Sequence, residues 1–177
     1  MVPKKPDIFV SYSRRHVALV TPLVQLLRVG DRTIFKDDDS IAPGDDYEVV
    51  IKKSLRRAKV VVVIWCLHAK RSRWVKAEYQ AAVALKKPLI PVRIDHTPFP
   101  DDLGRFQAID MSAVVKHEQT RSDAARIEGL ELGGARSIPM ARSGLVRPFI
   151  GREPATPPSA GEILARVVME RVRILTK

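Results

Sequence analysis

An unbroken run of apolar, mostly β-branched residues from Val60 to Trp65 constrains the fold most strongly. Such a run is typical of a strand that is covered on both faces, because no polar side chain alternates toward solvent. Strands of this kind occur mainly in parallel sheets with helices on both sides. We therefore expect an α/β protein with residues 60–65 as a buried strand.

Short apolar runs and helical patterns alternate along the rest of the chain. We predict further strands over residues 7–12, 32–35, 88–94 and 106–109, and helices over residues 17–27, 47–58 and 73–85. Strands that alternate with helices imply crossover connections and hence a parallel sheet. The expected fold is α/β, with a five-stranded parallel sheet, helices on both faces and ligands at the carboxyl ends of the strands.

Pro22 lies inside the first predicted helix and leaves two interpretations open. In the first, the regular helix starts at the proline and Thr21 is its N-cap. In the second, the helix begins earlier and is kinked at the proline.

The last third of the chain changes character. We expect residues 1–132 to form the domain and residues 133–161, which are rich in Pro and Gly, to form a loop or linker. Residues 162–177 carry an apolar helical stripe. We expect this helix to pack back on the domain, because residues 113–130 have too few apolar side chains to cover a sheet face. The competing interpretation is a free helix that recruits a partner or a second copy.

The chain carries a formal net charge of +11. This balance favours anionic partners such as nucleic acid, an acidic membrane surface or a phosphorylated small molecule, but a solvated basic surface explains it equally well. The single cysteine, Cys66, excludes an internal disulfide framework and suits a reducing compartment. No apolar run reaches the roughly 18–20 residues of a membrane span, and the start lacks the apolar stretch of a secretory signal. We expect a cytoplasmic protein.

Several familiar motifs are absent from the sequence. Neither GxGxxG nor GxxxxGK[ST] occurs, so no standard glycine cradle holds a dinucleotide or a triphosphate. The absence of GxSxG argues against an α/β-hydrolase. A phospho-receiver of this topology needs acidic residues after the first strand and an aspartate after the third, where this chain has Tyr12 and Cys66.

Two groups of residues suggest metal or thiol chemistry only weakly. The triplet Asp37, Asp38 and Asp39 lacks the spaced ligands and closing glutamate of a calcium loop, so a solvated loop that lends one carboxylate to a sugar fits better. Cys66 and His68 are too few for a metal site, and a single cysteine at a strand end is usually a small buried hydrophobe. We predict no metal site.

Trp74 and Glu78 lie four residues apart on a predicted helix, hence on one face and one turn apart. An aromatic plane beside a carboxylate suits a ribosyl-nicotinamide, since the ring forms a wall for the flat base and the carboxylate binds the ribose hydroxyls. The alternative is a partly buried tryptophan over a solvent-exposed glutamate, because WxxxE by itself is a weak signal.

Three segments share the order and spacing of a known family. Residues 9–15 (FVSYSRR), 34–47 (IFKDDDSIAPGDDY) and 72–79 (SRWVKAEY) look like the opening box, the second strand with its BB loop, and the S-x-W-x-x-x-E segment of TIR domains. The chain therefore resembles a TIR (Toll/interleukin-1 receptor) domain of the bacterial type over residues 6–111. The resemblance implies a flavodoxin-like fold.

The resemblance also implies NAD+ nucleosidase chemistry, in which Glu78 holds the position of the catalytic glutamate. The residues implied to bind the dinucleotide are Ser11, Tyr12, Arg14, Asp37, Ser40 and Trp74. NAD+ is the substrate and no cofactor is expected; the products are nicotinamide and either ADP-ribose or a cyclic isomer. Nicotinamide leaves as a neutral base, so the enzyme mainly has to stabilise an oxocarbenium-like ribose, as glycosidases do with a carboxylate.

Further implications of the resemblance concern partners and role. TIR enzymes act through TIR–TIR contacts, here including the loop from Asp37 to Tyr47, and bacterial members suggest antiphage immune signalling or a secreted effector. Two residues depart from the family pattern: His16 replaces a frequent aspartate, and Cys66 replaces a common serine at the end of the third strand. Both leave the polarity of the pocket open.

Two other functions compete with the enzyme. A non-catalytic TIR scaffold would act by self-association alone, although it has no need of the Trp74 and Glu78 pair. A binder of anionic polymers would use the basic face of the second helix, which comprises Lys52, Lys53, Arg56 and Arg57. No aromatic side chain interleaves that face, as single-strand stacking requires, so nucleic acid is not the expected partner.

Overall fold

A five-stranded parallel sheet forms the centre of the computed structural model, which describes residues 8–29, 34–36, 47–132 and 157–176. Its strands are β1 (Ile8–Ser11), β2 (Ile34–Lys36), β3 (Val60–Trp65), β4 (Leu89–Arg93) and β5 (Ile109–Asp110). They follow the order β2-β1-β3-β4-β5, and every neighbouring pair is parallel. The expected α/β fold with a parallel five-stranded sheet is confirmed.

β3 occupies the middle of this sheet, and all six of its residues are buried. Val62 pairs in register with Val10 of β1 on one side and with Ile90 of β4 on the other. Its bounds are those predicted from the unbroken apolar run, because a strand covered on both faces leaves an unambiguous signal. The shorter strands are displaced from their predicted bounds by one to three residues, since their ends carry no such signal.

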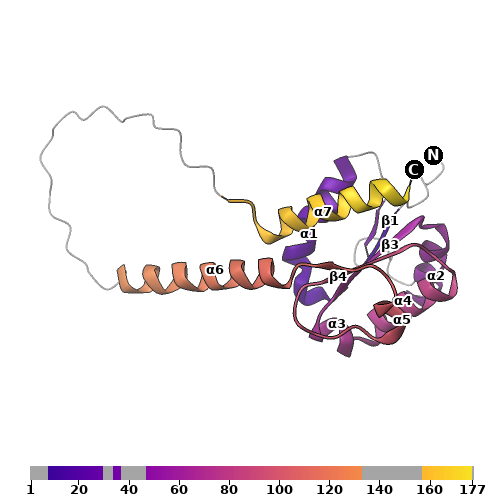
Figure 1. Ribbon diagram of the computed structural model, residues 1–177, viewed down its shortest axis with the longest axis horizontal. Helices are drawn as coiled ribbons and strands as arrows, with labels where there is room; N and C mark the ends of the chain where they lie inside the picture. The colour runs from indigo at the N-terminus through magenta and orange to yellow at the C-terminus, as the bar shows by residue number, and fades with distance from the viewer. Residues whose placement is uncertain (1–7, 30–33, 37–46, 133–156, 177) are drawn as a thin grey trace, which may run out of the picture.

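Helices cover both faces of the sheet. On one face, α1 (Val17–Val29), which follows the short 3₁₀ helix η1 (Arg14–His16), packs against α7 (Ala160–Leu175). On the other face, α2 (Tyr47–Arg57) packs against α4 (Arg73–Ala84) (Figure 1). Two short helices, α3 (Leu67–Arg71) and α5 (Asp101–Gly104), were not expected from the sequence, because four or five residues are too few to establish a helical period.

α1 runs through Pro22, so the interpretation in which the regular helix starts at that proline is wrong. Thr21 is not an N-cap: its hydroxyl donates to the backbone carbonyl of Val17 at 2.7 Å, one turn earlier. The proline ring faces the start of α7, where a Cβ atom added to Gly161 would lie 2.8 Å from Pro22 Cγ and 2.9 Å from the Leu19 carbonyl oxygen. Only glycine allows α7 to approach α1 this closely.

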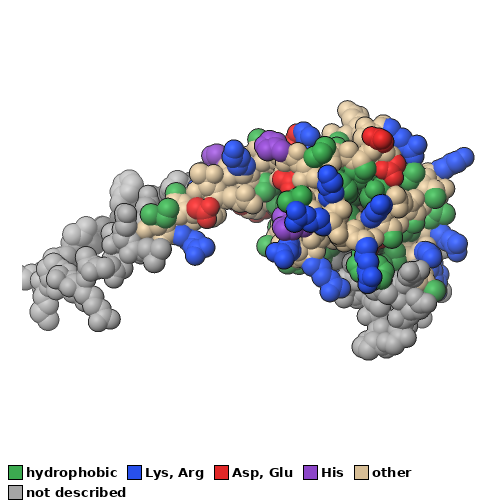
Figure 2. Space-filling model, turned by 90° about the horizontal axis from the view of Figure 1, so that it is seen from below, with side chains coloured by type: hydrophobic (Ala, Val, Ile, Leu, Met, Phe, Trp, Pro, Cys, Tyr) green, Lys and Arg blue, Asp and Glu red, His purple; other side chains and the backbone are tan. Residues whose placement is uncertain are grey.

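α6 (Ser112–Leu132) is a 21-residue helix that extends away from the sheet (Figure 1) and projects from the rounded domain in Figure 2. Its start is anchored by Ser112 and Val115, which are buried, whereas the side chains of residues 119–127 are exposed. The segment is therefore helical without covering a sheet face, in keeping with its sparse apolar residues. None of the helices in the described ranges has the length and hydropathy to cross a bilayer.

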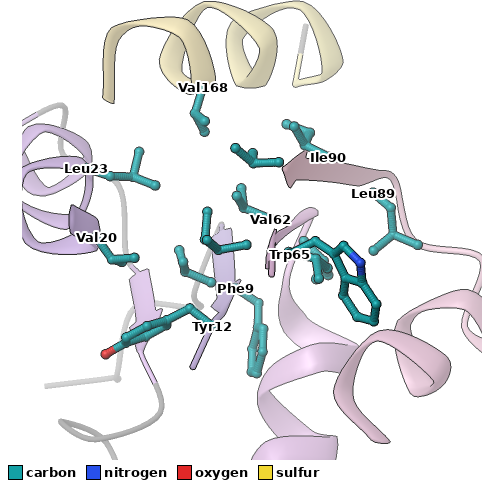
Figure 3. Packing of buried hydrophobic residues seen from close by; sticks show 14 of the residues in the cluster. Phe9, Tyr12, Val20, Leu23, Val62, Trp65, Leu89, Ile90 and Val168 are labelled. Carbon is teal, nitrogen blue, oxygen red and sulfur yellow. The ribbon is translucent and has the colours of Figure 1, made fainter. Parts of the chain in front are cut away.

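α7 supplies the apolar cover that α6 does not. Leu164, Val168 and Val172 are fully buried, and Figure 3 shows Val168 directed toward Leu23 of α1 and Ile90 of β4. The helix begins at Ala160, two residues before the predicted start, because Ser159 and Glu162 form a capping box there. The division of the chain into domain, linker and returning helix stays a prediction, since residues 133–156 lie outside the described ranges.

Candidate functional site

The candidate site lies where β1 ends and α4 begins. Ser11 is the last residue of β1, at the carboxyl edge of the sheet. α4 starts after Ser72, whose hydroxyl accepts a hydrogen bond from the Val75 backbone N–H at 3.3 Å and so caps the helix. From this start, Trp74 lies in the first turn and Glu78 in the second, so both face the same side of the helix.

Ser11 and Glu78 form a buried hydrogen bond. The Ser11 hydroxyl donates to Glu78 Oε2 at 2.5 Å, a length typical of a hydroxyl bound to a carboxylate. Ser11 is fully buried and Glu78 is 2% exposed. A carboxylate withdrawn from water needs such partners, because burial of an unpaired polar group is costly. The contact fixes the orientation of the carboxylate at the carboxyl edge of the sheet.

The side chain of Trp74 is exposed, whereas that of Glu78 is buried. The indole is 37% exposed, and the Arg73 guanidinium lies 5.0 Å from the centre of its ring. The alternative drawn from the sequence, a partly buried tryptophan over a solvent-exposed glutamate, is therefore wrong for the glutamate, because its carboxylate is buried. Glutamate side chains are rarely buried to this extent unless they are paired, as Glu78 is with Ser11.

Two pockets meet at Trp74. The outer pocket, of about 530 Å³, is lined by Tyr12, Ser13, Arg14, Arg15, Ser72, Trp74 and Val75. The inner pocket, of about 170 Å³, lies between α2 and α4 and is lined by Ile51, Lys52, Leu55, Trp74, Ala77, Glu78 and Ala81. Trp74 is the residue that both linings share. The outer pocket has the size of a small-molecule site.

The predicted site residues are thus partly assembled. Tyr12, Arg14 and Trp74 line the outer pocket, and Ser11 holds Glu78 beside the inner one. Asp37 and Ser40 lie outside the described residues, as does most of the loop expected to mediate self-association.

Comparison with known proteins decides the family. The family model of the TIR domain matches residues 8–127, which is more than half of the chain. The chain belongs to the TIR domain family. The crystal structure of the TIR domain of the Toll-related receptor TRR-2 from Hydra magnipapillata matches with a TM-score of 0.54 and 16% sequence identity, covering 66% of this chain and 97% of that chain. At this identity the likeness shows the fold alone. No curated protein matches the chain.

His16 and Cys66, the two departures from the family pattern, follow β1 and β3 at the carboxyl edge of the sheet. His16 closes η1, and its ring centre lies 5.8 Å from that of His68 in α3. Burial, reinforced by the nearby His68, lowers the pKa of His16, and Asp95 only partly opposes this shift. The pair therefore brings the end of η1 against α3.

Cys66 is a buried helix cap in this TIR domain. Its Sγ accepts a hydrogen bond from the Ala69 backbone N–H at 3.3 Å at the start of α3. Burial raises the pKa of the Cys66 thiol, so the reactive thiolate is disfavoured. Within the described ranges no three His, Cys, Asp or Glu side chains are placed to hold a metal ion.

Asp95 anchors the loop that follows β4. Its carboxylate accepts the Leu67 backbone N–H at 2.8 Å and the Thr97 backbone N–H at 2.9 Å. Burial raises the pKa of Asp95, but these hydrogen bonds outweigh it and hold the pKa below its ordinary value.

Sequence reasoning missed three contributors to the site: Arg15, Ser72 and Lys52. Arg15 and Ser72 line the outer pocket, and Lys52 lines the inner one. Arg15 and Ser72 belonged to the segments that resembled the family and could have been selected from them. Lys52 could not, because its place in the lining of the inner pocket depends on how α2 packs against α4.

Proposed function

We propose that this TIR domain is an NAD+ nucleosidase that cleaves the nicotinamide–ribose bond to give nicotinamide and ADP-ribose or a cyclic ADP-ribose isomer. The observation that carries the proposal is the buried carboxylate of Glu78, held by Ser11 one helical turn from the exposed indole of Trp74. Departure of nicotinamide leaves positive charge on the ribose, and a fixed carboxylate in a water-poor site stabilises such charge strongly.

The outer pocket supplies the other requirements of this substrate. Trp74 and Tyr12 offer aromatic surfaces to a flat base, and Arg14 provides a cation for the pyrophosphate of a dinucleotide. Asp37 and Ser40, outside the described residues, remain proposed contacts to the remainder of the substrate. NAD+ is the substrate in this proposal, and no cofactor or metal is required.

A movement of Trp74 would connect the pocket beside Glu78 with the outer pocket. The carboxylate borders the inner pocket, whereas the arginines border the outer one, and the indole belongs to both linings. We therefore expect the indole to turn aside when the ribose enters. A neighbouring copy that stabilises the turned position would make the reaction depend on self-association, so specific activity should rise with protein concentration.

The alternative is a non-catalytic scaffold that acts only by self-association. The observation in its favour is the same burial: a carboxylate that is 2% exposed and bound by Ser11 also fits a structural role. On this alternative the chain would associate without consuming NAD+.

One experiment separates the two functions. The purified chain is incubated with NAD+ over a range of protein concentrations, and nicotinamide and the ribose product are identified by mass spectrometry. The proposal expects nicotinamide release with specific activity that rises with concentration. Association without nicotinamide release would favour the scaffold. The proposed setting, cytoplasmic immune signalling against phage in a bacterium, follows only if NAD+ is consumed.

A further inference from the structure

A basic surface with exposed apolar side chains lies at the carboxyl edge of the sheet. Five exposed cations define it, Arg14 and Arg15 on η1, Lys70 and Arg71 on α3, and Arg73 at the start of α4. Three large apolar side chains stand among them: Val17 and Leu67, each 42% exposed, and Trp74. We call these eight residues the basic edge surface.

Contacts between the three segments make this surface continuous. The rings of His16 and His68 bring the end of η1 against α3, and these histidines are the chain neighbours of Val17 and Leu67. Arg14, Arg15 and Trp74 line the same pocket, which brings η1 against the start of α4. The apolar side chains therefore share one edge of the domain with the cations.

Two acidic side chains near this surface, Glu78 and Asp95, are already engaged by hydrogen bonds. Glu78 is buried and accepts from Ser11. The carboxylate of Asp95 accepts two backbone N–H groups, as described above. The charge of Asp102 in α5 acts on Tyr79 of α4. Figure 2, seen from the side of α3 and α4, shows Lys and Arg side chains across this face with hydrophobic side chains exposed between them.

We propose that the basic edge surface docks the domain on an anionic lipid bilayer. Cations near an acidic membrane surface are attracted to its negative potential, and exposed Leu, Val and Trp side chains enter the boundary between headgroups and acyl chains. Each kind of side chain alone is ordinary on a protein surface. Their combination on one edge matches the chemistry of a peripheral membrane contact, which needs no membrane-spanning helix.

The apolar side chains favour a bilayer over nucleic acid as the partner. Single-stranded nucleic acid binds along a cationic groove that offers several aromatic rings for successive bases. In the described part of this surface Trp74 is the single aromatic side chain, and aliphatic Val17 and Leu67 have no counterpart in such binding. In a bilayer, by contrast, all three apolar side chains can enter the boundary between headgroups and acyl chains.

Docking has a consequence for the outer pocket. Arg14, Arg15 and Trp74 belong both to its lining and to the basic edge surface. A bilayer seated on this edge therefore covers the mouth of the pocket. This consequence does not depend on which molecule the pocket binds.

The test measures binding of the full chain to vesicles at about 100 mM salt, in a sedimentation assay without NAD+. Vesicles of phosphatidylcholine alone are compared with vesicles that also contain phosphatidylserine. We expect binding to the anionic vesicles only, weakened as salt rises. The Lys70→Ala/Arg71→Ala double variant should bind roughly 25-fold more weakly, at about fivefold for each cation removed.

The matched control is the Lys59→Ala/Lys86→Ala double variant, which removes the same charge at the opposite edge of the sheet. Lys59 directly precedes β3, and Lys86 lies in the turn before β4. This variant should bind almost as well as the unaltered chain. Equal losses in the two double variants would mean that net charge alone drives binding and would overturn the proposal. Absence of vesicle binding, or preferential binding of a single-stranded oligonucleotide that displaces the vesicles, would overturn it as well.

Tryptophan fluorescence provides a second readout at the surface itself. Trp65 is buried in β3, so an emission shift on vesicle addition reports Trp74. We expect a blue shift with anionic vesicles that is absent from a Trp74→Phe variant, whose emission comes from Trp65 alone. Sedimentation with the vesicles but unchanged emission of the unaltered chain would place the contact elsewhere and contradict the proposal. Neither assay uses NAD+, so failure of the nucleosidase proposal leaves both results interpretable.

Discussion

The Ser11 hydroxyl donates a 2.5 Å hydrogen bond to Oε2 of Glu78 and joins the end of β1 to α4 across 67 positions of the chain. Both side chains are buried, so the carboxylate depends on protein groups in place of water. One bond therefore couples the packing of α4 on the sheet to the orientation of the group on which the proposed chemistry depends.

Ser11→Ala should destabilise the fold and reduce activity together. The substitution removes a hydrogen bond to a buried carboxylate, an interaction worth about 1.5–3 kcal/mol. Thermal unfolding should shift to lower temperature, and nicotinamide release by the folded fraction should fall. Ser13→Ala is the control for stability and should melt like the unaltered chain, because the Ser13 side chain makes no capping hydrogen bond to the adjacent helix η1. Equal melting of Ser11→Ala and the unaltered chain would contradict the assigned contact.

Gly161→Ala should loosen α7 from α1. The new methyl group would lie 2.8 Å from Pro22 Cγ and 2.9 Å from the Leu19 carbonyl oxygen, and backbone cannot move aside as easily as the end of a side chain. Overpacking of this kind costs about 1–3 kcal/mol. In Gly104→Ala the nearest atom, Phe99 Cβ, is 3.9 Å away, so that variant should melt like the unaltered chain. Equal midpoints of unfolding in the two variants would contradict the close contact between α7 and α1.

Stability should decline as pH falls below the ordinary histidine range. Burial, followed by the effect of His68, lowers the pKa of His16, whereas Asp95 raises it by a smaller amount. Below a pH of about 6.5 the unfolded chain takes up this proton before the folded chain does, so the contribution of His16 is complete above that pH and is lost toward the lower folded pKa. Unfolding by urea at pH 5 and at pH 7.5 measures the difference.

A His16→Asn variant isolates this contribution. Its stability should depend less on pH over that interval than the stability of the unaltered chain does. A slope that is unchanged in His16→Asn would show that other groups control acid sensitivity.

Prediction from sequence was strongest where one residue pattern carries one meaning. The run from Val60 to Trp65 specified its strand without error. The predicted helix over residues 73–85 also begins where α4 begins, at Arg73, because the preceding Ser72 is a favoured N-cap residue. α3 was missed although Cys66 caps it, since cysteine is an uncommon cap and five residues show no period. α6 carries almost no apolar stripe. Its sequence therefore indicated that it does not cover a face of the sheet, but did not indicate that it is a helix.

The sequence predicted which residues belong to the site better than it predicted how they are arranged. Tyr12, Arg14 and Trp74 could be selected from motifs, and they line one pocket. The burial of Glu78 could not be predicted, because helical spacing places it on the side of Trp74 without specifying how closely α2 and β1 approach that side. Long-range packing decided that Trp74 is exposed and Glu78 is not.

The central claim is that the Glu78 carboxylate stabilises a ribosyl cation, and NAD+ turnover by Glu78→Gln tests it most directly. Glutamine keeps the shape of the side chain and an oxygen that accepts from Ser11, and removes only the negative charge. Glu118→Gln on α6 is the matched control. With both variants shown to fold by circular dichroism and thermal melting, nicotinamide release should fall by roughly 10²–10³ in Glu78→Gln and stay unchanged in Glu118→Gln. Undiminished NAD+ turnover by folded Glu78→Gln would contradict the account.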